Sequence, residues 1–212
     1  PAPDTALHTF CHALPGRWHQ MGVILAATDA LAWYSLLVGA DPAALTKDLG
    51  ALQAPGRTMF LPYLGGERTP HNDAQVRGAF LGLEHATDRS AATRAVLEGV
   101  AFAFRDRLNA MAATGNELSH VVAVGGGSRS IYWLEAIATA LNLPIAVPAD
   151  GDFGATFGAA RLAMMAAGLG GPELATPPAI KSLIEPSSGH SAAFEAAYDR
   201  YKAAYSALRE VS

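Results

Sequence analysis

The residue pattern with the clearest chemistry is a run of glycines between a short apolar strand and an amphipathic helix. The strand is expected at residues 120–124, the glycine turn covers 125–130, and the helix runs to about Leu143. Three consecutive glycines let the backbone approach a ligand closely, because no Cβ stands in the way. The N-terminus of the helix adds free N–H groups and the positive end of its dipole. The pattern therefore predicts a site for the phosphate or the sugar of a nucleotide.

Two other interpretations of this turn stay open. Gly125, Gly127 and Ser130 give the spacing G-x-G-x-x-S, which lacks the third glycine of the dinucleotide fingerprint, and the chain contains no Gly-Lys-Ser/Thr P-loop. Asp150 nevertheless follows a second strand, expected at 144–148, near the place of the ribose-binding acid in Rossmann-type oxidoreductases. A tight turn without any ligand is the other alternative, because glycines also serve turns that bind nothing.

A second polar cluster lies in the segment GGERTPHND, between two expected strands. Arg68, His71, Asn72 and Asp73 stand close together there. They either face a cleft, where they contact phosphates or a second lobe, or form a proline-fixed turn in which Asn72 and Asp73 bond their own backbone. The sequence does not choose between the two.

Four potential metal ligands or nucleophiles occur near the start of the chain: His8, Cys11, His12 and His19. Their spacing matches no closed zinc site, since soft ligands are few and a proline and a tryptophan interrupt any single face. A Cys–His nucleophile would need a third positioned group, and the sequence shows none. We therefore expect no metal ion here and expect Cys11 to be a small core residue.

The composition excludes several functional classes. Hydrophobic residues make up 50% of the 212 residues and charged residues 16%, against about 25% in an ordinary soluble domain, which excludes intrinsic disorder. Lys and Arg total 15, Asp and Glu 19, and the net charge is −4 without any run of like charge, so we expect no nucleic acid as main partner. The single cysteine and the lack of a signal-peptide pattern favour a cytoplasmic location. Every apolar stretch is interrupted before it could span a membrane, so no membrane association is expected.

The glycine turn has to be positioned by an α/β fold, because strand-like and helix-like periodicities alternate along the chain. A helix is expected at 21–38 and ends at Gly39. The other expected elements are a strand at 7–13, a short helix at 42–49 capped by Asp41, strands at 58–64 and 76–83, a long helix capped by Thr87 or Asp88 and closed at 114–116, and a helix at 155–168.

Two features of the C-terminal part concern association. The helix at 155–168 presents the small residues Gly158, Ala159, Ala160 and Ala163, which would let it approach a neighbouring element closely, with Asp152 as its cap. After a surface loop expected at 169–190, the last helix carries an aromatic stripe, typical of a core or of a docking surface. Together with the first helix, expected at 21–38, these apolar faces exceed what one sheet covers, so we expect a homodimer. The stripe consists of Phe194, Tyr198, Tyr201, Tyr205 and Leu208.

Several segments, in their order along the chain, resemble the C-terminal lobe of the FGGY carbohydrate kinase family. They are HTFCHALPGRWHQMG, FLPYLGGERTPHND, RGAFLGL, RAVLEGVAFAFRD, VVAVGGGSRSIYWLEAIA and FGATFGAARLA, and they cover residues 7–167. The family signature fits at 78–83 and 95–98 and departs at Ala91 and Ala92, early in a helix. The final stretch resembles the family only in its layout of a loop and a tyrosine-bearing helix.

The resemblance implies an actin-like, ribonuclease-H-like α/β lobe with a mixed sheet flanked by helices. It implies that residues 1–212 form the C-terminal, nucleotide-side lobe of a sugar kinase, and that the N-terminal, sugar-binding lobe is absent from this sequence. By position, Gly126 and Gly127 correspond to glycines that lie against the nucleotide, and Ser130 and Ile131 to residues that line the adenine. Gly78 corresponds to a glycine beside the phosphates.

The resemblance also implies the reaction: ATP-dependent phosphorylation of D-xylulose at its terminal hydroxyl, with Mg²⁺, to give D-xylulose 5-phosphate and ADP. In the family, the catalytic aspartate and a Gly-Thr-Ser phosphate loop precede the segment with which this sequence opens. We therefore expect no catalytic residue and no metal ligand here, and no activity from this chain alone. Kinases of ribulose, gluconate or glycerol are the nearest alternatives, and a non-catalytic, actin-like interaction module that binds a nucleotide is another.

Overall fold

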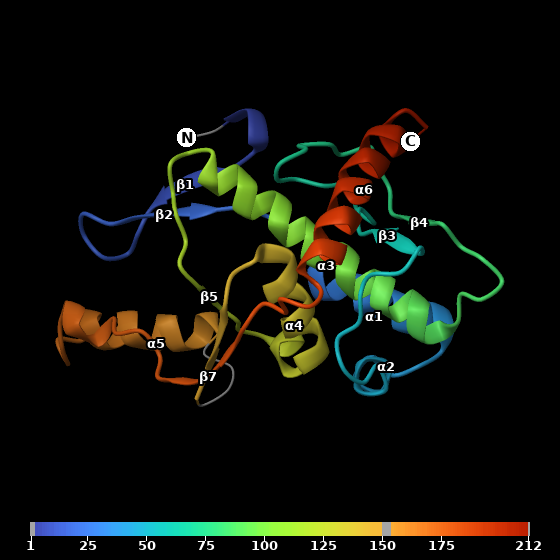
Figure 1. Cartoon of the computed structure of the whole chain (residues 1–212). Helices are drawn as coiled ribbons and strands as arrows, with labels where there is room; N and C mark the ends of the chain where they lie inside the picture. Colours follow the sequence, from blue (N-terminus) through green and yellow to red (C-terminus); the bar gives the residue numbers. More distant parts are fainter. Residues whose placement is uncertain (1–2, 150–153, 212) are drawn as a thin grey trace.

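The helix α3 (Arg89–Ala112) runs through the middle of the molecule, and most of the other elements pack around it (Figure 1). The computed structural model describes residues 3–149 and 154–211. The helix begins as predicted, because the Asp88 side chain accepts a hydrogen bond from the Ala91 N–H at 2.7 Å. Its buried residues run from Thr93 to Ala110, so α3 forms the centre of the core.

A two-stranded antiparallel sheet lies directly on α3. β3 (Met59–Leu61) pairs with β4 (Ala79–Leu81), and β3 is buried along its whole length. Gly99 of α3 makes this contact feasible, because a Cβ at that position would overlap the carbonyl oxygen of Phe60. Both strands lie within the segments that the sequence predicts.

The helix predicted at 21–38 begins later than expected, and α1 covers Ala27–Val38. Its first predicted residue belongs to a strand instead, and the backbone that follows is held by distant partners. The Val23 N–H donates to Thr69 Oγ1 at 3.0 Å, and the Val23 carbonyl accepts from the Arg107 guanidinium. These bonds use the backbone groups that another helical turn would need.

The connection between α1 and the next helix follows the prediction. Gly39 ends α1 in the left-handed conformation, with φ +62°. Asp41 caps α2 (Pro42–Lys47), and its side chain accepts hydrogen bonds from the N–H groups of Ala43 and Ala44 at 2.9 and 3.0 Å. Both ends of this short connection are therefore fixed by local sequence.

A three-stranded mixed sheet packs against α4 (Ile131–Leu141). β5 (Val121–Val122) runs parallel to β6 (Ile145–Pro148), and β6 pairs antiparallel with β7 (Ile180–Ile184). An apolar cluster around Leu134 joins α4 to this sheet. The mixed sheet with flanking helices agrees with the predicted fold class.

Strand β7 corrects the prediction of a surface loop at 169–190. The strand is short and mostly exposed, and prolines lie on both sides of it, so its sequence shows no alternation of buried and exposed residues. It forms because it pairs with the edge of β6, where Ile145 lies opposite Ile184. The rest of the segment includes one helical turn, η3 (Pro172–Leu174).

The N-terminal part of the chain forms an antiparallel hairpin after a single helical turn, η1 (Pro3–Thr5). β1 (His8–Cys11) pairs with β2 (Trp18–Met21). The prediction that Cys11 lies in the core is wrong, because its side chain is exposed at the end of β1. Among the described strands, β1 and β2 pair only with each other, and exposed residues occur in both.

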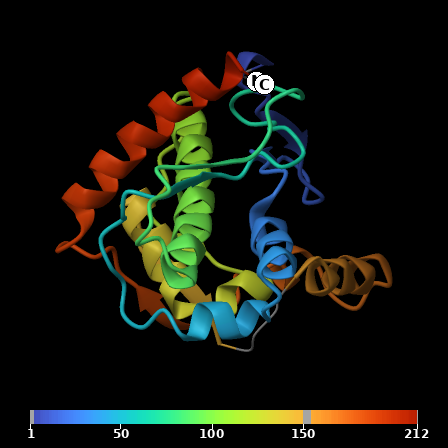
Figure 2. The same cartoon turned by 90° about the vertical axis from the view of Figure 1, so that its right-hand side faces the viewer.

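Helix α6 (Ser191–Arg209) lies alongside α3 and buries its aromatic stripe there (Figure 2). Phe194, Tyr198 and Tyr201 are buried, and their ring centroids lie 5.5 to 6.0 Å from that of Phe102. The stripe is thus part of the core, one of the two roles that the sequence allows. It is not the exposed docking surface from which we expected a homodimer.

Helix α5 (Ala155–Ala166) projects from the body of the molecule (Figure 1, Figure 2). None of its residues is buried, and a Cβ at Gly158 would meet no atom within 4 Å. The expectation that its small residues pack closely against a neighbour is therefore wrong for the described part of the chain. The predicted cap, Asp152, lies outside the described residues. No helix in the described ranges is long and apolar enough to cross a bilayer.

Candidate functional site

One groove brings together four of the five residues that the resemblance assigns to the nucleotide. Gly126, Gly127, Ser130 and Ile131 line this groove, whose volume is about 670 Å³. The glycine turn and the first residues of α4 form one wall, and α1 and α2 form the other. The opposite wall includes Thr28 and Ala32 of α1 and Ala43, Thr46 and Lys47 of α2.

The glycine turn is held by its own hydrogen bonds. Gly125 has φ +89°, a conformation that favours glycine, and its carbonyl accepts from the Ser128 N–H and hydroxyl at 3.1 and 2.7 Å. A single helical turn, η2 (Gly126–Arg129), follows, and Ser130 Oγ caps α4 by accepting from the Trp133 N–H at 3.3 Å. The wall therefore has a defined shape without a ligand, which lowers the cost of binding one.

Gly126 and Gly127, which are both predicted to lie against the nucleotide, belong to η2 but have different surroundings. A Cβ at Gly126 would meet no atom within 4 Å, so this position faces open space. A Cβ at Gly127 would lie 2.9 Å from Thr28 Cγ2 and 3.1 Å from Trp133 Cζ3. Gly127 thus lets α1 and α4 approach each other, which gives a packing reason for this glycine beside its predicted contact with the nucleotide.

Trp133 connects the groove to the core. The residue is buried, and its Nε1–H donates to the Leu97 carbonyl of α3 at 3.0 Å. It also lines the groove, so the position of the groove wall depends on the contact between α3 and α4. Sequence reasoning missed this residue, because an aromatic side chain at a helix start is typical of a core.

The charge and the polarity of the groove suit a nucleotide. Lys47 and Arg129 line it, and none of its described lining residues is Asp or Glu. Ile131 is 56% exposed at the start of α4, so it offers an apolar surface to a flat ring. Sequence reasoning also missed Thr46 and Lys47, because nothing in the sequence links α2 to a turn so much later in the chain.

Gly78 lies outside this groove. It precedes β4, and a Cβ there would come within 2.9 Å of Leu64 Cδ2 and 3.1 Å of the Leu61 carbonyl oxygen. The absence of a side chain lets the backbone pass close to the end of β3. Its place beside the phosphates stays a prediction, since Gly78 is not among the residues that line the groove.

The polar loop between β3 and β4 bonds to itself. Asp73 Oδ1 accepts from the N–H groups of Val76 and Gln75 at 3.0 and 2.9 Å, and these bonds hold the pKa of the Asp73 carboxyl below its usual value. The Asn72 N–H donates to the Arg68 carbonyl at 2.5 Å. Of the two interpretations of this loop, the geometry favours the self-bonded turn.

His71 leaves the loop to contact the C-terminal helix. Its ring stacks on Tyr205, with 3.6 Å between the centroids, and its Nε2 lies 3.3 Å from the Tyr63 hydroxyl and 3.6 Å from Asp106 Oδ2. The Tyr198 hydroxyl donates to Asp106 Oδ1 at 2.6 Å. The cluster joins the loop, α3 and α6, so His71 has a structural role.

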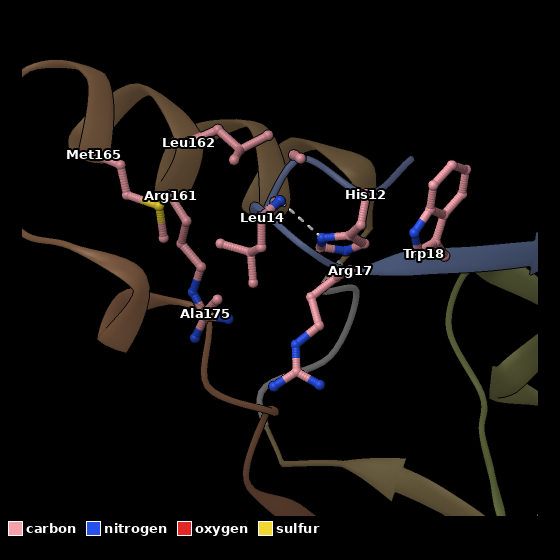
Figure 3. Close-up of a pocket in the computed structure, with 10 residues that line it drawn as sticks. His12, Leu14, Arg17, Trp18, Arg161, Leu162, Met165 and Ala175 are labelled. Atoms are coloured by element: carbon pink, nitrogen blue, oxygen red, sulfur yellow. Dashed lines mark hydrogen bonds between the residues drawn. The ribbon is translucent and has the colours of Figure 1, made fainter. Parts of the chain in front are cut away.

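A second hollow, of about 590 Å³, lies between the β1–β2 loop and α5 (Figure 3). His12, Arg17 and Arg161 line it, and the Leu14 N–H donates to His12 Nδ1 at 3.0 Å. Arg161 is partly engaged, because it donates to the Thr176 carbonyl at 2.6 Å. None of the five predicted site residues lines this hollow, so it is not the site that the sequence predicts.

The potential metal ligands near the start of the chain are spread along the hairpin. The Phe10 ring lies between His8 and His19, with centroids 5.7 and 5.6 Å away. Across the ranges 3–149 and 154–211, no three His, Cys, Asp or Glu side chains gather closely enough to hold a metal ion.

Similar proteins identify the family. Residues 1–167 match the C-terminal domain of the FGGY family of carbohydrate kinases. The chain is 43% identical over 185 residues to the xylulose kinase of Escherichia coli strain K12, which covers 86% of this chain and 36% of that protein. It is 42% identical over 166 residues to the xylulose kinase of Klebsiella pneumoniae, which covers 77% of this chain and 34% of that protein. The chain thus spans about a third of the length of these relatives.

Solved structures agree with this match. A xyloylose kinase from Brucella ovis has a TM-score of 0.95 and 59% identity, covering 100% of this chain and 45% of that one. A xylulose kinase from Rhodospirillum rubrum has a TM-score of 0.82 and 27% identity, covering 97% and 43%. The predicted actin-like kinase lobe is confirmed by these folds. Because the family match includes the glycine turn and both walls of the groove, this chain belongs to the FGGY family of carbohydrate kinases.

Proposed function

We propose that this chain is the nucleotide-binding C-terminal lobe of an ATP-dependent kinase, which in the complete enzyme converts D-xylulose to D-xylulose 5-phosphate. One observation carries the proposal: Gly126, Ser130 and Ile131, which the resemblance assigns to the nucleotide, line one groove together with Lys47. The similarity to xylulose kinases supports D-xylulose as the sugar. A cytoplasmic location stays a prediction.

The residues of the groove fit the adenosine part of ATP. The open backbone at Gly126 would lie against the nucleotide, Ile131 would contact the adenine, and Ser130 would border the base at the start of α4. Lys47 would attract the phosphates, and no carboxylate among the described lining residues opposes it. When bound, ATP supplies the phosphoryl group that the sugar hydroxyl accepts.

Mg²⁺ would enter with the nucleotide. This ion keeps several waters and binds through one or two carboxylates and the substrate phosphates. A cluster of three protein ligands is therefore not required, and the described residues contain none. The part of this chain in the reaction is to hold the nucleotide in position.

A second, N-terminal lobe is proposed to supply the sugar site and the catalytic base. The chain covers 36% of the Escherichia coli relative and 45% of the Brucella ovis structure, so more than half of each lies outside the match. A general base has to reach the sugar hydroxyl, and the described lining of this groove includes no Asp or Glu. ATP and sugar would then meet in a cleft between the two lobes.

The strand order favours a kinase lobe over a Rossmann-type oxidoreductase. β5 and β6 are parallel, but β7 pairs antiparallel with β6, whereas a dinucleotide-binding fold continues with parallel strands. Asp150, considered above as a ribose-binding acid, lies outside the described residues. The alternative of a non-catalytic interaction module is separated by a transfer assay, since only a kinase consumes ATP when sugar is added. Comparison of D-xylulose with ribulose, gluconate and glycerol in the complete enzyme identifies the sugar.

Calorimetry with ADP tests the groove in this chain itself. We expect weak binding, because the second lobe would supply part of the contacts. Gly126→Val should weaken the binding about tenfold or more, equivalent to ~1.4 kcal/mol, since the new side chain fills space that the nucleotide needs.

The matched control is Gly158→Val, the same substitution at a glycine of α5 that also faces open space. It should leave the ADP affinity unchanged. Gly127→Val is less suitable, because it would disturb Thr28 and Trp133 in the packed wall. Equal ADP affinities of the wild-type chain and Gly126→Val would contradict the assignment of the groove.

A further inference from the structure

Glu98 is a buried acid that the proposed nucleotide site does not use directly. It lies in the middle of α3, only 3% of its surface is exposed, and no described residue donates a hydrogen bond to its Oε1. Buried polar atoms are usually paired, because an unpaired one costs free energy. The position of Glu98 therefore needs a physical reason.

Glu98 has neighbours in two segments outside α3. It shares a cavity of about 10 Å³ with Gly56 and Thr58, in the segment between α2 and β3. On the α4 side is Tyr132, which lines the groove and whose buried hydroxyl also has no partner among the described residues. Burial first, and then the nearby Glu98 carboxylate, raise the pKa of this hydroxyl above its usual value.

The next residue of α4 shows how firmly this wall depends on α3. Trp133 donates its Nε1–H to the carbonyl of Leu97, the residue before Glu98. The first turn of α4 is therefore packed on the part of α3 that carries the unpaired Oε1 of Glu98.

Two arginines are the charged groups that act on Glu98. Burial raises the pKa of Glu98 to about 7, while Arg94 on α3 and Arg200 on α6 lower it only in part. Arg200 lines the same small cavity but donates to the Gly56 carbonyl at 2.9 Å. Tyr132 is the titratable group that faces Glu98 from α4.

We propose that Glu98 is a positioning residue of the nucleotide groove: its neutral carboxyl lets the first turn of α4 pack against α3, and its ionisation loosens that turn. This inference rests on the proposed function in one respect, that the groove binds a nucleotide.

The physical reason is the cost of an unpaired charge in the core. A neutral carboxyl needs no counter-charge. An ionised Glu98 is stabilised either by drawing Arg200 away from Gly56 or by admitting water at Tyr132. The second change acts directly on a groove wall, because Tyr132 lies in the first turn of α4 and lines the groove.

Unfolding measured against pH is the first readout. Because the pKa of Glu98 in the folded chain is raised, the folded state binds its proton more tightly than the unfolded chain between about pH 4.5 and 7. The protonated Glu98 therefore contributes to the free energy of unfolding below about pH 4.5, and this contribution is lost as the pH rises to about 7. The Glu98→Gln variant has no carboxyl to titrate at this position and should not lose stability in this range. The free energies of unfolding of the wild-type chain and the variant should therefore diverge with rising pH up to about pH 7.

Hydrogen exchange of the Trp133 and Leu134 amides, which donate to Ser130, is the readout for the groove without ligand. At about pH 6 the wild-type chain and Glu98→Gln should exchange at equal rates. At about pH 8.5 the wild-type chain should exchange about tenfold faster, because with a pKa of about 7 the ionised fraction of Glu98 rises from about a tenth at pH 6 to nearly all at pH 8.5. Equal rates at the higher pH would overturn the proposal.

Affinity for ADP separates this inference from the proposed function. At about pH 8.5 Glu98→Gln should bind ADP severalfold more tightly than the wild-type chain, and at about pH 6 equally well. If neither protein binds ADP at any pH, the proposed nucleotide site fails. Hydrogen exchange still decides the role of Glu98 in that case.

Two more variants complete the test. Glu117→Gln is the matched control, the same substitution at an exposed acid after α3, and it should keep the wild-type pH profile. If Glu98→Gln does not fold, Tyr132→Phe is the second route, because it retains Glu98 and should retain the pH-dependent exchange. A loss of that dependence in Tyr132→Phe would assign the effect to the tyrosine and overturn the proposal.

Discussion

The two carboxylate oxygens of Asp73 have different partners. Oδ1 accepts from the N–H groups of Gln75 and Val76, which fixes the loop before β4. Oδ2 accepts from the Tyr205 hydroxyl at 3.3 Å, which ties the same loop to α6. One short side chain thus stabilises a local turn and a contact between distant parts of the chain.

Asp73→Ala should lower the free energy of unfolding by about 1 kcal/mol, the usual effect of losing a side chain that caps backbone N–H groups. The backbone bonds, that from Val76 first, lower the pKa of Asp73 in the folded chain. The ionised Asp73 therefore stabilises the folded chain at pH values above the pKa that this carboxyl has in the unfolded chain. This stabilisation is lost as the pH falls through the lower pKa of the folded chain. Urea unfolding at about pH 7 and about pH 3 measures the difference between the two proteins. That difference should be smaller at the lower pH, and a constant difference would contradict the prediction.

Among single residues, the sequence predicts the glycine turn better than the residues that face it. The glycines of the turn and Ser130 are neighbours in the chain, so a local pattern groups them, whereas Ile131 is assigned by the family resemblance. Lys47 reaches the same groove only because α1 and α2 pack against the turn, and packing between distant segments leaves no local pattern. Gly78 was assigned by resemblance alone, and the structure places it outside the groove.

Between elements, α3 and β3 approach each other closely at Gly99. A Cβ at Gly99 would overlap the Phe60 carbonyl oxygen, whereas most glycines of the described chain have more room. The strand cannot move away freely, because Phe60 and Leu61 are buried on all sides. The distance between helix and strand is therefore set by the missing side chain.

Gly99→Ala should lower the free energy of unfolding by about 1–3 kcal/mol, as overpacking of a core does. In an exposed helix the same change would raise stability by about 1 kcal/mol, because alanine favours the helix more than glycine does. Gly158→Ala in α5 is the control for that second effect, since its Cβ would meet no atom within 4 Å. Urea unfolding of the three proteins decides the outcome. A Gly99→Ala protein as stable as Gly158→Ala would show that β3 shifts at little cost.

Elements with strong local signals agree with the sequence, and elements made by distant partners do not. α3 and α4 begin at their capping residues, and α6 carries its aromatic stripe on the buried face. α1 begins late because Thr69 and Arg107 hold the backbone of Val23. β7 exists because β6 offers an edge to pair with. In both exceptions, hydrogen bonds to remote residues decide the structure, and such bonds leave no periodicity in the sequence.

For the whole molecule, one group of exposed apolar side chains lies on the hairpin and α5. Both views place the β1–β2 hairpin and α5 on the same side of the body (Figure 1, Figure 2). Phe10, Trp18 and Met21 are exposed in the hairpin, and Leu162 and Met164 in α5. Because the aromatic stripe of α6 belongs to the core, the expected self-association depends on two other apolar surfaces, that of the hairpin and α5 and that of α1, where Leu36 and Leu37 are exposed. Of the two, the surface of hairpin and α5 carries more exposed large apolar side chains.

We expect two copies of the chain to associate through this surface, most simply as a two-fold dimer. Trp18 and Leu162 line the same hollow, so they belong to one continuous patch (Figure 3). The double variant Trp18→Ser and Leu162→Ser should weaken the dimer at least about tenfold, since burial of one large apolar side chain contributes ~1.5–3 kcal/mol.

The control is Leu36→Ser, which removes an exposed leucine from α1 and should leave the dimer unchanged. Sedimentation at tens of micromolar compares the three proteins. A wild-type chain that stays monomeric at these concentrations would contradict the prediction, and it would mean that the hairpin and α5 cover each other in solution more fully than the open hollow between them suggests. A dimer that Leu36→Ser weakens as much as the double variant would place the contact on α1 instead, next to the nucleotide groove, where ADP would then compete with self-association.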